Sequence, residues 1–299
     1  DFPSFLSKGD VLVINQARVI PARVWGKKGD REIDFLFLEE AERGIWKVLC
    51  RPARRIQLGD TIHFSSRLVG EVVKVEEAGK RMIQFSEKDV LSELKKIGYA
   101  PLPPYIKRTK ENQILKELDL KRYQTIYARR GKAVAAPTAG LHFTEEILEE
   151  IREKEVILCP ISLDVGLATF QPVRTDRVEN HRMLEETYSI SRKSASQINS
   201  ALKDGRPIVA VGTTSVRALE SACKQGRVLP GRASTNLFIY PGYSFRVVDR
   251  LLTNFHLPKS TLLMLAAAFT GLDFIKKAYR EAVRRKYRFY SYGDCMFIL

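Results

Sequence analysis

The stretch "IVAVGTTSVRALES" (residues 208–221) has the pattern of a buried strand that leads directly into a helix. Its continuous apolar run ends at Gly212, and two threonines then begin a helical segment. A strand without polar alternation is typical of a parallel sheet that helices cover on both faces. The stretch therefore predicts a strand–helix unit of an α/β fold.

The same alternation continues over most of the chain beyond residue 100. The further segments that read as strands or amphipathic helices are "KAVAAP" (132–137), "TEEILEEIREK" (144–154), "EVILCPISL" (155–163), "SASQINSALKDG" (194–205), "NLFIYPG" (236–242), "FRVVDRLL" (245–252), "STLLMLAAAF" (260–269), "FIKKAYREAVRR" (274–285) and a last strand in "CMFIL" (295–299). "VLVINQ" (11–16) and "ARVIPARV" (17–24) read as strands of the same sheet. We therefore expect one mixed sheet with covering helices.

Residues 32–87 have a different pattern, with short alternating strands separated by polar turns. The predicted strands are "EIDFLFLEE" (32–40), "GIWKVLCR" (44–51), "DTIHFSS" (60–66), "LVGEVVKVEE" (68–77) and "RMIQFSE" (81–87). A helix-like segment follows, and the prolines of "YAPLPPYIKRTK" (99–110) mark a boundary. The sequence predicts a small antiparallel β-barrel domain at 28–98, inserted into an α/β domain formed by 1–27 and 99–299.

Charge is the informative bulk property of this 299-residue chain. It has 50 Lys and Arg against 35 Asp and Glu, a net charge of +15. The basic residues cluster in "RPARR" (51–55), "KRTK" (107–110), "ARRGK" (128–132) and "YREAVRRKYR" (279–288). Any one such run can be a solvated face, but four of them favour a nucleic-acid partner. Because zinc-finger, RNP and KH patterns are missing from the sequence, we expect RNA as the substrate of an enzyme.

Cysteine and histidine spacing gives no sign of a metal site. The four cysteines lie far apart, mostly within apolar runs, and the four histidines are not paired at ligand spacing. We expect free buried thiols, a cytoplasmic protein, and no metal. The longest uncharged apolar stretch, residues 260–272, is too short for a membrane helix. The chain opens without methionine or a secretory pattern, so we expect further residues upstream.

In open α/β sheets, ligands bind beyond the carboxyl ends of the strands, where loops lead into helices. The first such loop lies in "AAPTAGLHFTEEILEE" (135–150), where Thr138 and Gly140 form a tight turn and His142 precedes the helix cap Thr144. A core histidine and a site histidine are equally compatible with this pattern.

The second loop starts at Gly212. Thr213 and Thr214 can simply cap the helix. Their hydroxyls and the backbone amides of a helix start also make a cradle for a carboxylate or a hydroxyl, and Arg217 lies one turn further on to clamp an anion. The alternative is a surface Arg217 paired with Glu220.

The third loop places Asn254, Phe255 and His256 near the start of a helix that is apolar enough to be buried. Polar groups at such a position are rarely needed for packing alone. Near the end of the chain, Tyr292 and Asp294 form a turn into the last strand, with Asp294 either shaping the turn or facing the same cleft.

The chain closely resembles the S-adenosylmethionine:tRNA ribosyltransferase-isomerase family of queuosine biosynthesis. The resemblance is carried by "GDVLVINQARVIPARVWG" (9–26), "PLPPYIKR" (101–108), "YQTIYARRGKAVAAPTAGLHFT" (123–144), "VGLATFQPV" (165–173), "VGTTSVRALES" (211–221), "FIYPGYSF" (238–245), "LLTNFHLPKSTLLMLAAAF" (251–269) and "YRFYSYGD" (287–294). It implies an α/β domain with an inserted six-stranded barrel.

The resemblance also implies a reaction. The ribosyl part of S-adenosylmethionine moves onto the aminomethyl group of 7-aminomethyl-7-deazaguanine in tRNA, giving epoxyqueuosine-tRNA, adenine and methionine. S-adenosylmethionine is a consumed substrate, and no further cofactor is implied. We expect the enzyme to be a monomer.

Our hypothesis is that His142 or His256 removes the proton beside the sulfonium while the other protonates adenine or accepts a proton from the incoming amine. Arg217, Thr213 and Thr214 would hold the methionine carboxylate. Thr138 and Asn254 would orient the ribose or the base.

Three positions in two motifs depart from the family pattern. Asp164 stands where the family usually has a histidine, and Leu184 and Glu185 replace a histidine and a serine. Asp164 retains a titratable group that can act as a base or as a cation partner, whereas Leu184 cannot.

Two rival functions stay open. A tRNA methyltransferase would use the same substrates but normally shows a glycine-rich loop after its first strand, which the sequence lacks. A relative that binds tRNA without activity would keep only the basic surface.

Overall fold

The computed structural model describes residues 1–108, 112–166, 173 and 175–299. The chain forms two compact units. The sheet unit comprises Asp1–Arg18, Gln124–Gly131 and Ala136–Leu299, and the barrel unit comprises Val19–Tyr123 and Lys132–Ala135. Most of the "VGLATFQPV" motif and part of the "KRTK" run lie outside the described residues.

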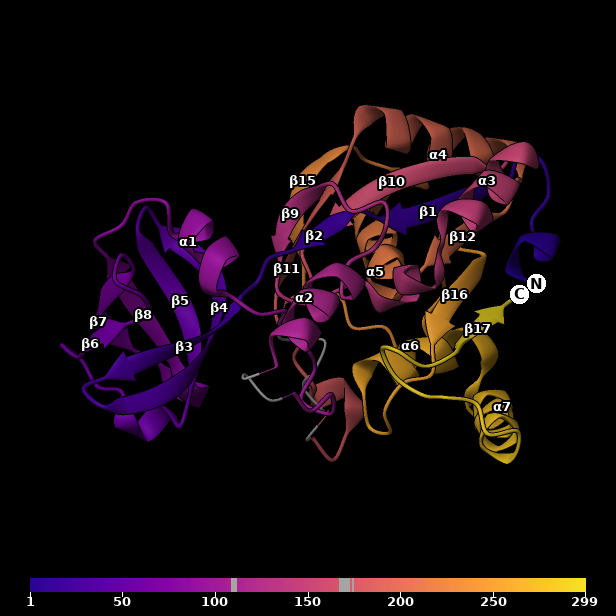
Figure 1. Ribbon diagram of the computed structural model, residues 1–299. Helices are drawn as coiled ribbons and strands as arrows, with labels where there is room; N and C mark the ends of the chain where they lie inside the picture. Colours follow the sequence, from indigo (N-terminus) through magenta and orange to yellow (C-terminus); the bar gives the residue numbers. More distant parts are fainter. Residues whose placement is uncertain (109–111, 167–172, 174) are drawn as a thin grey trace. The chain divides into compact units, whose positions relative to one another are not determined.

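A seven-stranded mixed sheet forms the centre of the sheet unit (Figure 1). Its strands, in spatial order, are β15 (Gly231–Thr235), β11 (Glu186–Ile190), β10 (Ile157–Leu163), β1 (Val11–Asn15), β12 (Ile208–Val211), β16 (Arg250–Asn254) and β17 (Cys295–Ile298). The four strands from β10 to β16 are parallel neighbours, and the strands on either side of them are antiparallel. The carboxyl ends of those four strands therefore share one edge of the sheet.

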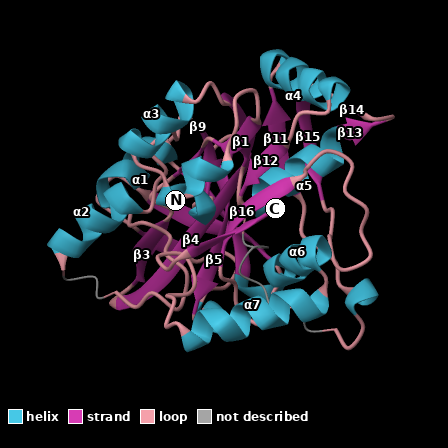
Figure 2. Cartoon of the chain, turned by 90° about the vertical axis from the view of Figure 1, so that its right-hand side faces the viewer, coloured by secondary structure: helices cyan, strands magenta, loops and turns pink. Residues whose placement is uncertain are grey.

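Helices cover both faces of the parallel strands, and Figure 2 shows α3 and α5 on opposite sides of them. The helices of this unit are α3 (Glu145–Glu153), α4 (Arg192–Asp204), α5 (Thr213–Ala222), α6 (Thr261–Thr270) and α7 (Leu272–Arg284), with the 3-10 turns η1 (Phe2–Phe5), η4 (Thr138–His142) and η6 (Val178–Asn180). Leu12, Val209 and Leu252 pack against Phe143 and Ile151 of the η4 and α3 region. Because strand side chains alternate, the neighbouring positions face α4 and α5, and α6 packs against α5.

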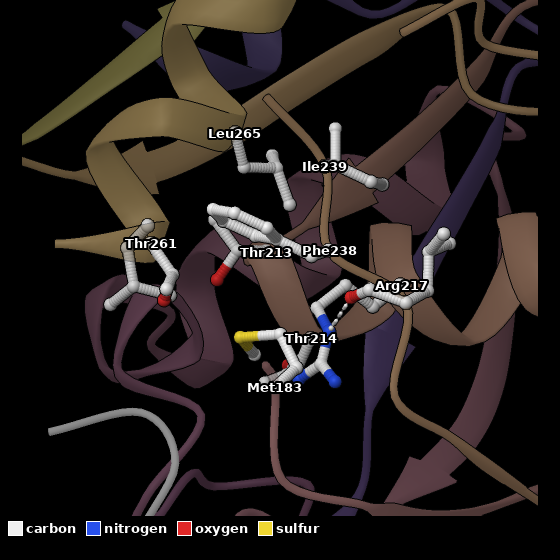
Figure 3. A pocket seen from close by; sticks show the side chains of 10 residues that line it. Met183, Thr213, Thr214, Arg217, Phe238, Ile239, Thr261 and Leu265 are labelled. Atoms are coloured by element: carbon white, nitrogen blue, oxygen red, sulfur yellow. Dashed lines mark hydrogen bonds between the residues drawn. The ribbon is translucent and has the colours of Figure 1, made fainter. Parts of the chain in front are cut away.

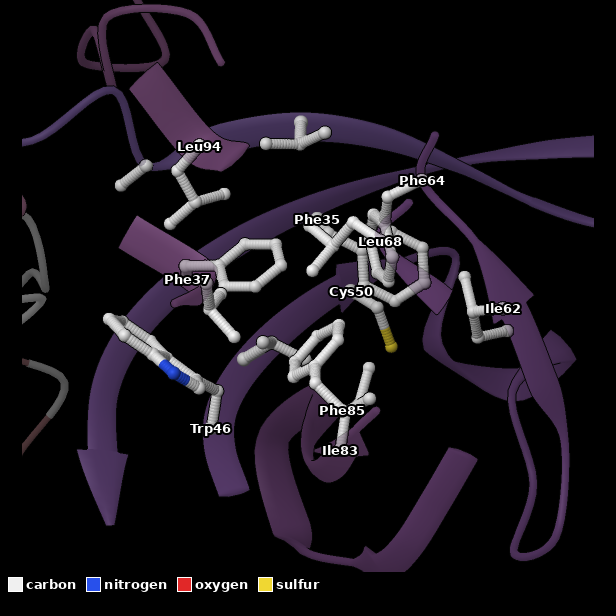
Figure 4. Close-up of a cluster of buried hydrophobic side chains, with 14 of the residues drawn as sticks. Phe35, Phe37, Trp46, Cys50, Ile62, Phe64, Leu68, Ile83, Phe85 and Leu94 are labelled. Atoms are coloured by element: carbon white, nitrogen blue, oxygen red, sulfur yellow. The ribbon is translucent and has the colours of Figure 1, made fainter. Parts of the chain in front are cut away.

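The barrel unit is a closed antiparallel barrel in the order β3-β4-β5-β8-β7-β6. Its strands are β3 (Arg23–Lys28), β4 (Arg31–Glu42), β5 (Ile45–Arg51), β6 (Thr61–His63), β7 (Val69–Val75) and β8 (Lys80–Phe85), with the 3-10 turns η2 (Ala53–Arg55) and η3 (Glu77–Gly79). The interior is filled by aromatic and aliphatic side chains, among them Phe35, Phe37 and Trp46, so the barrel is a packed core (Figure 4). Helices α1 (Val90–Ile97) and α2 (Gln113–Arg122) follow in the same unit.

Two short two-stranded sheets complete the fold. One pairs β2 (Ala17–Val19) with β9 (Arg130–Ala133), and the other pairs β13 (Cys223–Lys224) with β14 (Arg227–Val228). The four cysteines are free thiols, three of them buried, as their apolar surroundings predicted. Within the described part of the chain, no helix is long and apolar enough to cross a membrane.

The predicted fold class, a mixed-sheet α/β domain with an inserted antiparallel barrel, is confirmed. One strand assignment is wrong: "ARVIPARV" (17–24) does not join the large sheet. Its first residues form β2, which pairs with β9, and Arg23 and Val24 belong to β3, which pairs with β4 inside the barrel. The barrel unit accordingly starts before residue 28, and with α2 it runs past residue 98. The predicted strand at 236–242 is irregular, and β11, β15 and α2 were not predicted.

Candidate active site

The edge at the carboxyl ends of the parallel strands is held together by a buried asparagine. Asn15 ends β1, and its Nδ2 donates to Leu163 O at 3.0 Å and to Thr214 Oγ1 at 3.3 Å. Its Oδ1 accepts from the amides of Leu163 and Ala17 at 3.0 and 3.1 Å. One side chain therefore fixes the end of β10 and the start of α5 relative to β1.

The loop from β12 into α5 brings small residues together. Gly212 has φ of +86°, a conformation that favours glycine, and a Cβ at this position would lie 3.4 Å from Ala139 Cβ in η4. The second predicted loop therefore adjoins the first one. Thr213 and Thr214 are both buried at the start of α5, as the sequence predicted for this helix end.

A small cavity opens beside this helix start (Figure 3). Its volume is about 10 Å³, and its lining residues are Met183, Thr213, Thr214, Arg217, Leu237, Phe238, Ile239, Thr261, Leu262 and Leu265. The polar lining groups are three threonines and one arginine, and the other lining residues are apolar. The cavity can therefore take a small polar group that is attached to an apolar chain.

Arg217 enters this cavity as half of a buried ion pair. Its Nη1 donates to Glu186 Oε2, its Nε to Leu237 O at 3.0 Å, and its Nη2 to Thr235 O at 3.4 Å. Both side chains of the pair are less than a tenth exposed. Glu186 compensates the charge of Arg217, so the site is less electropositive than the sequence suggested.

The alternative pairing of Arg217 with Glu220 is wrong. Glu220 is fully buried, accepts hydrogen bonds from the amides of Arg246, Val247 and Val248, and also accepts one from the hydroxyl of Tyr243. Glu220 therefore shapes the loop before β16. The sequence did not identify Glu186 as the partner of Arg217, because Glu186 follows an irregular segment and lies far from Arg217 in the sequence.

The first and third predicted loops meet at a histidine–asparagine pair. Asn254 Nδ2 lies 2.9 Å from His142 Nε2 and donates to Tyr290 O at 3.2 Å. An amide nitrogen only donates, so His142 Nε2 accepts, and the proton of the neutral ring is on Nδ1. Among the described residues, Asn254 Oδ1 is buried without a hydrogen-bond partner.

The surroundings of His142 favour the neutral ring. Burial lowers the pKa of His142, the nearby Asp294 carboxylate offsets part of that effect, and the Arg288 guanidinium adds to it. His142 at neutral pH is therefore a neutral imidazole with an N–H available for donation.

His256 occupies a different environment. Its Nε2 is 2.8 Å from Thr253 Oγ1, and its backbone amide donates to the hydroxyl of Tyr279 in α7. Burial lowers its pKa to about 4. Thr253 and Asn254 are consecutive residues of β16, so their side chains point to opposite faces of the sheet. The two histidines are therefore bound to opposite faces of one strand.

Two further predicted residues lie in η4. Gly140 is buried beneath Tyr127, and a Cβ at this position would lie 2.1 Å from the Tyr127 hydroxyl. Only glycine allows this approach. Thr138, half-buried, begins the same turn.

The remaining predicted residues are spread around the edge of the sheet. Asp164 follows β10, with β1 and β12 between it and the β16 end. Phe255 packs in an aromatic cluster with Tyr279 and Phe289. Asp294 binds the amide and the guanidinium of Arg288 and so shapes a turn, and Tyr292 is exposed nearby.

Asn15, Thr261 and Phe238 also line or hold the site, although the sequence singled out none of them. Asn15 is the last residue of the "VLVIN" strand, and an amide that ends an apolar strand is a pattern from which its role at the site could have been predicted.

Among the described residues, no three His, Cys, Asp or Glu side chains are grouped as metal ligands would be.

Comparison with known proteins gives matches over the full chain. A family profile described as "Queuosine biosynthesis protein" matches residues 1–298. The S-adenosylmethionine:tRNA ribosyltransferase-isomerases of Clostridium kluyveri and Desulforamulus reducens are 48% and 46% identical, each over all of this chain and 87% of the relative. A crystal structure of S-adenosylmethionine tRNA ribosyltransferase from Thermotoga maritima is 34% identical with a TM-score of 0.51, covering all of this chain and 85% of that one.

The ion pair predicts a large effect of Glu186→Ala on stability. The change leaves Arg217 buried without a counter-charge, which should lower the free energy of unfolding by about 3–5 kcal/mol in chemical denaturation. The double variant Arg217→Met with Glu186→Met should lose much less free energy of unfolding than Glu186→Ala does. The matched control Glu149→Ala breaks an exposed pair with Arg152 and should cost less than about 1 kcal/mol. Equal losses for Glu186→Ala and Glu149→Ala would contradict this assignment.

The pKa of His256 predicts an acid-dependent loss of stability. Its value is 6.5 ordinarily and about 4 in the folded protein, so the unfolded state takes up a proton first as the pH falls. Stability should decline between these values by up to about 1.4 kcal/mol per pH unit from this group. In unfolding experiments across that range, His256→Gln should show a shallower slope than wild type. The control His63→Gln, at an exposed barrel position, should keep the wild-type slope, and parallel curves for all three proteins would refute the prediction.

Proposed function

The chain belongs to the queuosine biosynthesis protein family, and from this membership we propose that it acts as an S-adenosylmethionine:tRNA ribosyltransferase-isomerase. The observation that carries this proposal is the full-length match, with 48% identity to a relative of that name. In the proposed reaction, the ribosyl group of S-adenosylmethionine is transferred to the aminomethyl group of 7-aminomethyl-7-deazaguanine in tRNA and isomerised. Epoxyqueuosine-tRNA, adenine and methionine are the products.

We place the methionine end of S-adenosylmethionine at the start of α5. Backbone amides and hydroxyls at Thr213 and Thr214 supply donors for the carboxylate, and the positive end of the helix favours an anion. Arg217 lies in the lining with some N–H groups beyond those that Glu186 and the two carbonyls accept. The apolar lining from Leu237 and Leu265 suits the methylene groups next to the sulfonium.

We place the reacting nucleoside toward the pair of His142 and Asn254. Gly212 and Ala139 join this pair to the start of α5. The Nδ1–H of His142 is suited to stabilise the charge that develops on departing adenine, because a fixed donor in a partly buried site acts strongly. Asn254 Oδ1 and Thr138 are then available to orient ribose hydroxyls or the base.

The proposal gives His256 a supporting role. Its imidazole is buried and bound to Thr253 on the other face of β16, and its low pKa makes it a weak base. Asp164 stays a proposed base or partner of the sulfonium cation. Gly166, two residues further on, donates to Glu186, which connects this segment to the Arg217 pair.

Exposed cations of α7 are proposed to contact the tRNA backbone. Arg280 is exposed on α7, and Arg284 and Arg285 at the end of this helix both pair with Glu281. Arg288, in the segment after α7, is exposed and pairs with Asp294. Such contacts release counterions, so tRNA binding should weaken as the salt concentration rises. We further propose that the enzyme acts in the cytoplasm as a monomer without a metal or other cofactor.

The reaction class is tested by the products formed from S-adenosylmethionine and tRNA bearing the aminomethyl base. Free adenine is expected. S-adenosylhomocysteine would instead identify a methyltransferase, and salt-sensitive tRNA binding without either product would identify a binding protein.

His142→Ala should reduce the rate of adenine release by at least about 100-fold, because it removes a donor that acts on the transition state. The circular dichroism spectrum and the Tm should stay close to wild type. The control His63→Ala should turn over at the wild-type rate. The turnover rate of His256→Ala should fall only in proportion to the fraction of protein that is folded. A wild-type rate of adenine release in His142→Ala would show that His142 is not part of the site.

A further inference from the structure

Thr261 has a buried hydroxyl to which none of the described residues bonds. It is 5% exposed at the first position of α6, and its Oγ1 has no hydrogen-bond partner among the described residues. A helical threonine commonly bonds to the carbonyl four residues earlier, as Thr270 does with Ala266 O. For Thr261 that carbonyl is Leu257 O, which already accepts from Ser260 Oγ. A buried hydroxyl without a partner is costly and calls for an explanation.

The hydroxyl belongs to the lining of the cavity at the start of α5. Thr261 lies on α6, and Thr213 and Thr214 line the same cavity from α5 (Figure 3). The cavity is therefore bordered by hydroxyls from two helices. Thr214 Oγ1 already accepts from Asn15, whereas Thr261 still has its full capacity to donate and accept.

The size of the cavity decides which part of a ligand fits. A volume of about 10 Å³ is room for roughly one water molecule. A carboxylate is somewhat larger than a water molecule, so its entry requires side chains of the lining such as Met183 or Phe238, both on irregular segments, to shift; a purine ring is far too large. The helix start supplies positive potential, and Arg217, whose charge Glu186 compensates, still has N–H groups that can donate.

We infer that Thr261 is a specificity-determining residue that donates its hydroxyl hydrogen to the carboxylate of the methionine moiety. This inference deepens the proposed function and depends on it. The carboxylate would lie between α5 and α6, with the amides and hydroxyls of Thr213 and Thr214 on one side and Thr261 on the other. The hydroxyl of Thr261 would not add to the affinity for an S-adenosyl ligand that lacks the carboxylate.

The test is Thr261→Val, which keeps the shape of the side chain and removes the hydroxyl. The dissociation constant for S-adenosylmethionine, measured by calorimetry, should rise roughly ten-fold to a hundred-fold, as expected for a hydrogen bond to a charged group. The Tm should stay equal or rise, because none of the described residues bonds to this hydroxyl in the ligand-free protein. The matched control Thr270→Val, on the same helix, should leave the dissociation constant unchanged.

A second probe separates the carboxylate from the rest of the ligand. Decarboxylated S-adenosylmethionine should bind wild type and Thr261→Val with equal affinity. An equal loss for both ligands would overturn the carboxylate assignment. A lower Tm with unchanged affinity would show that the hydroxyl serves the fold, and would overturn the inference.

Failure of the inference can be distinguished from failure of the proposed function. If wild type neither binds S-adenosylmethionine nor releases adenine, the proposed function fails. If wild type does both and Thr261→Val has the same dissociation constant, the inference alone fails.

Discussion

The geometry of this site depends on the fully bonded amide of Asn15. The side chain is 1% exposed, and its four hydrogen bonds use both N–H groups and both acceptor positions of the oxygen. Its partners belong to the end of β10, to the start of α5, and to the chain that leaves β1. Because β1 is the middle strand of the seven, these bonds fix the edge of the sheet from its centre. The loops that carry candidate functional groups are thus built on a rigid support.

The polar groups around this edge fall into two kinds. Asn15, Glu220 and the Arg217–Glu186 pair are bonded on several sides by the protein itself, so they hold the fold. Asn254 Oδ1 and Thr261 Oγ1 are buried and, among the described residues, have no partner. A folded protein keeps such groups at a cost in stability. That cost is explained if both atoms bind substrate, and these two atoms would then mark the two ends of the proposed site.

Sequence patterns predicted the layout of the fold better than the detail of the site. The α/β alternation, the barrel insertion and the convergence of the loops at 138–142, 213–217 and 254–256 follow from periodicity and from the edge rule for parallel strands. The segment "ARVIPARV" (17–24) was misassigned because a short alternating strand has the same local pattern in a barrel or a two-stranded sheet as in a large sheet. Glu186 could not be identified as the partner of Arg217, since a buried ion pair between distant segments leaves no mark at local spacing.

The two histidines show how strand alternation assigns chemical roles. Asn254 and Thr253 are adjacent in β16, yet one fixes His142 on the η4 face and the other bonds His256 on the opposite face. In both rings burial favours the neutral form, and Nε2 of His142 is occupied by an N–H donor. A neutral ring in this tautomer donates through Nδ1 and is poorly placed to remove a proton. Proton removal beside the sulfonium would therefore fall to another group. The candidates are a carboxylate such as that of Asp164 and the substrate's own amine once it is neutral.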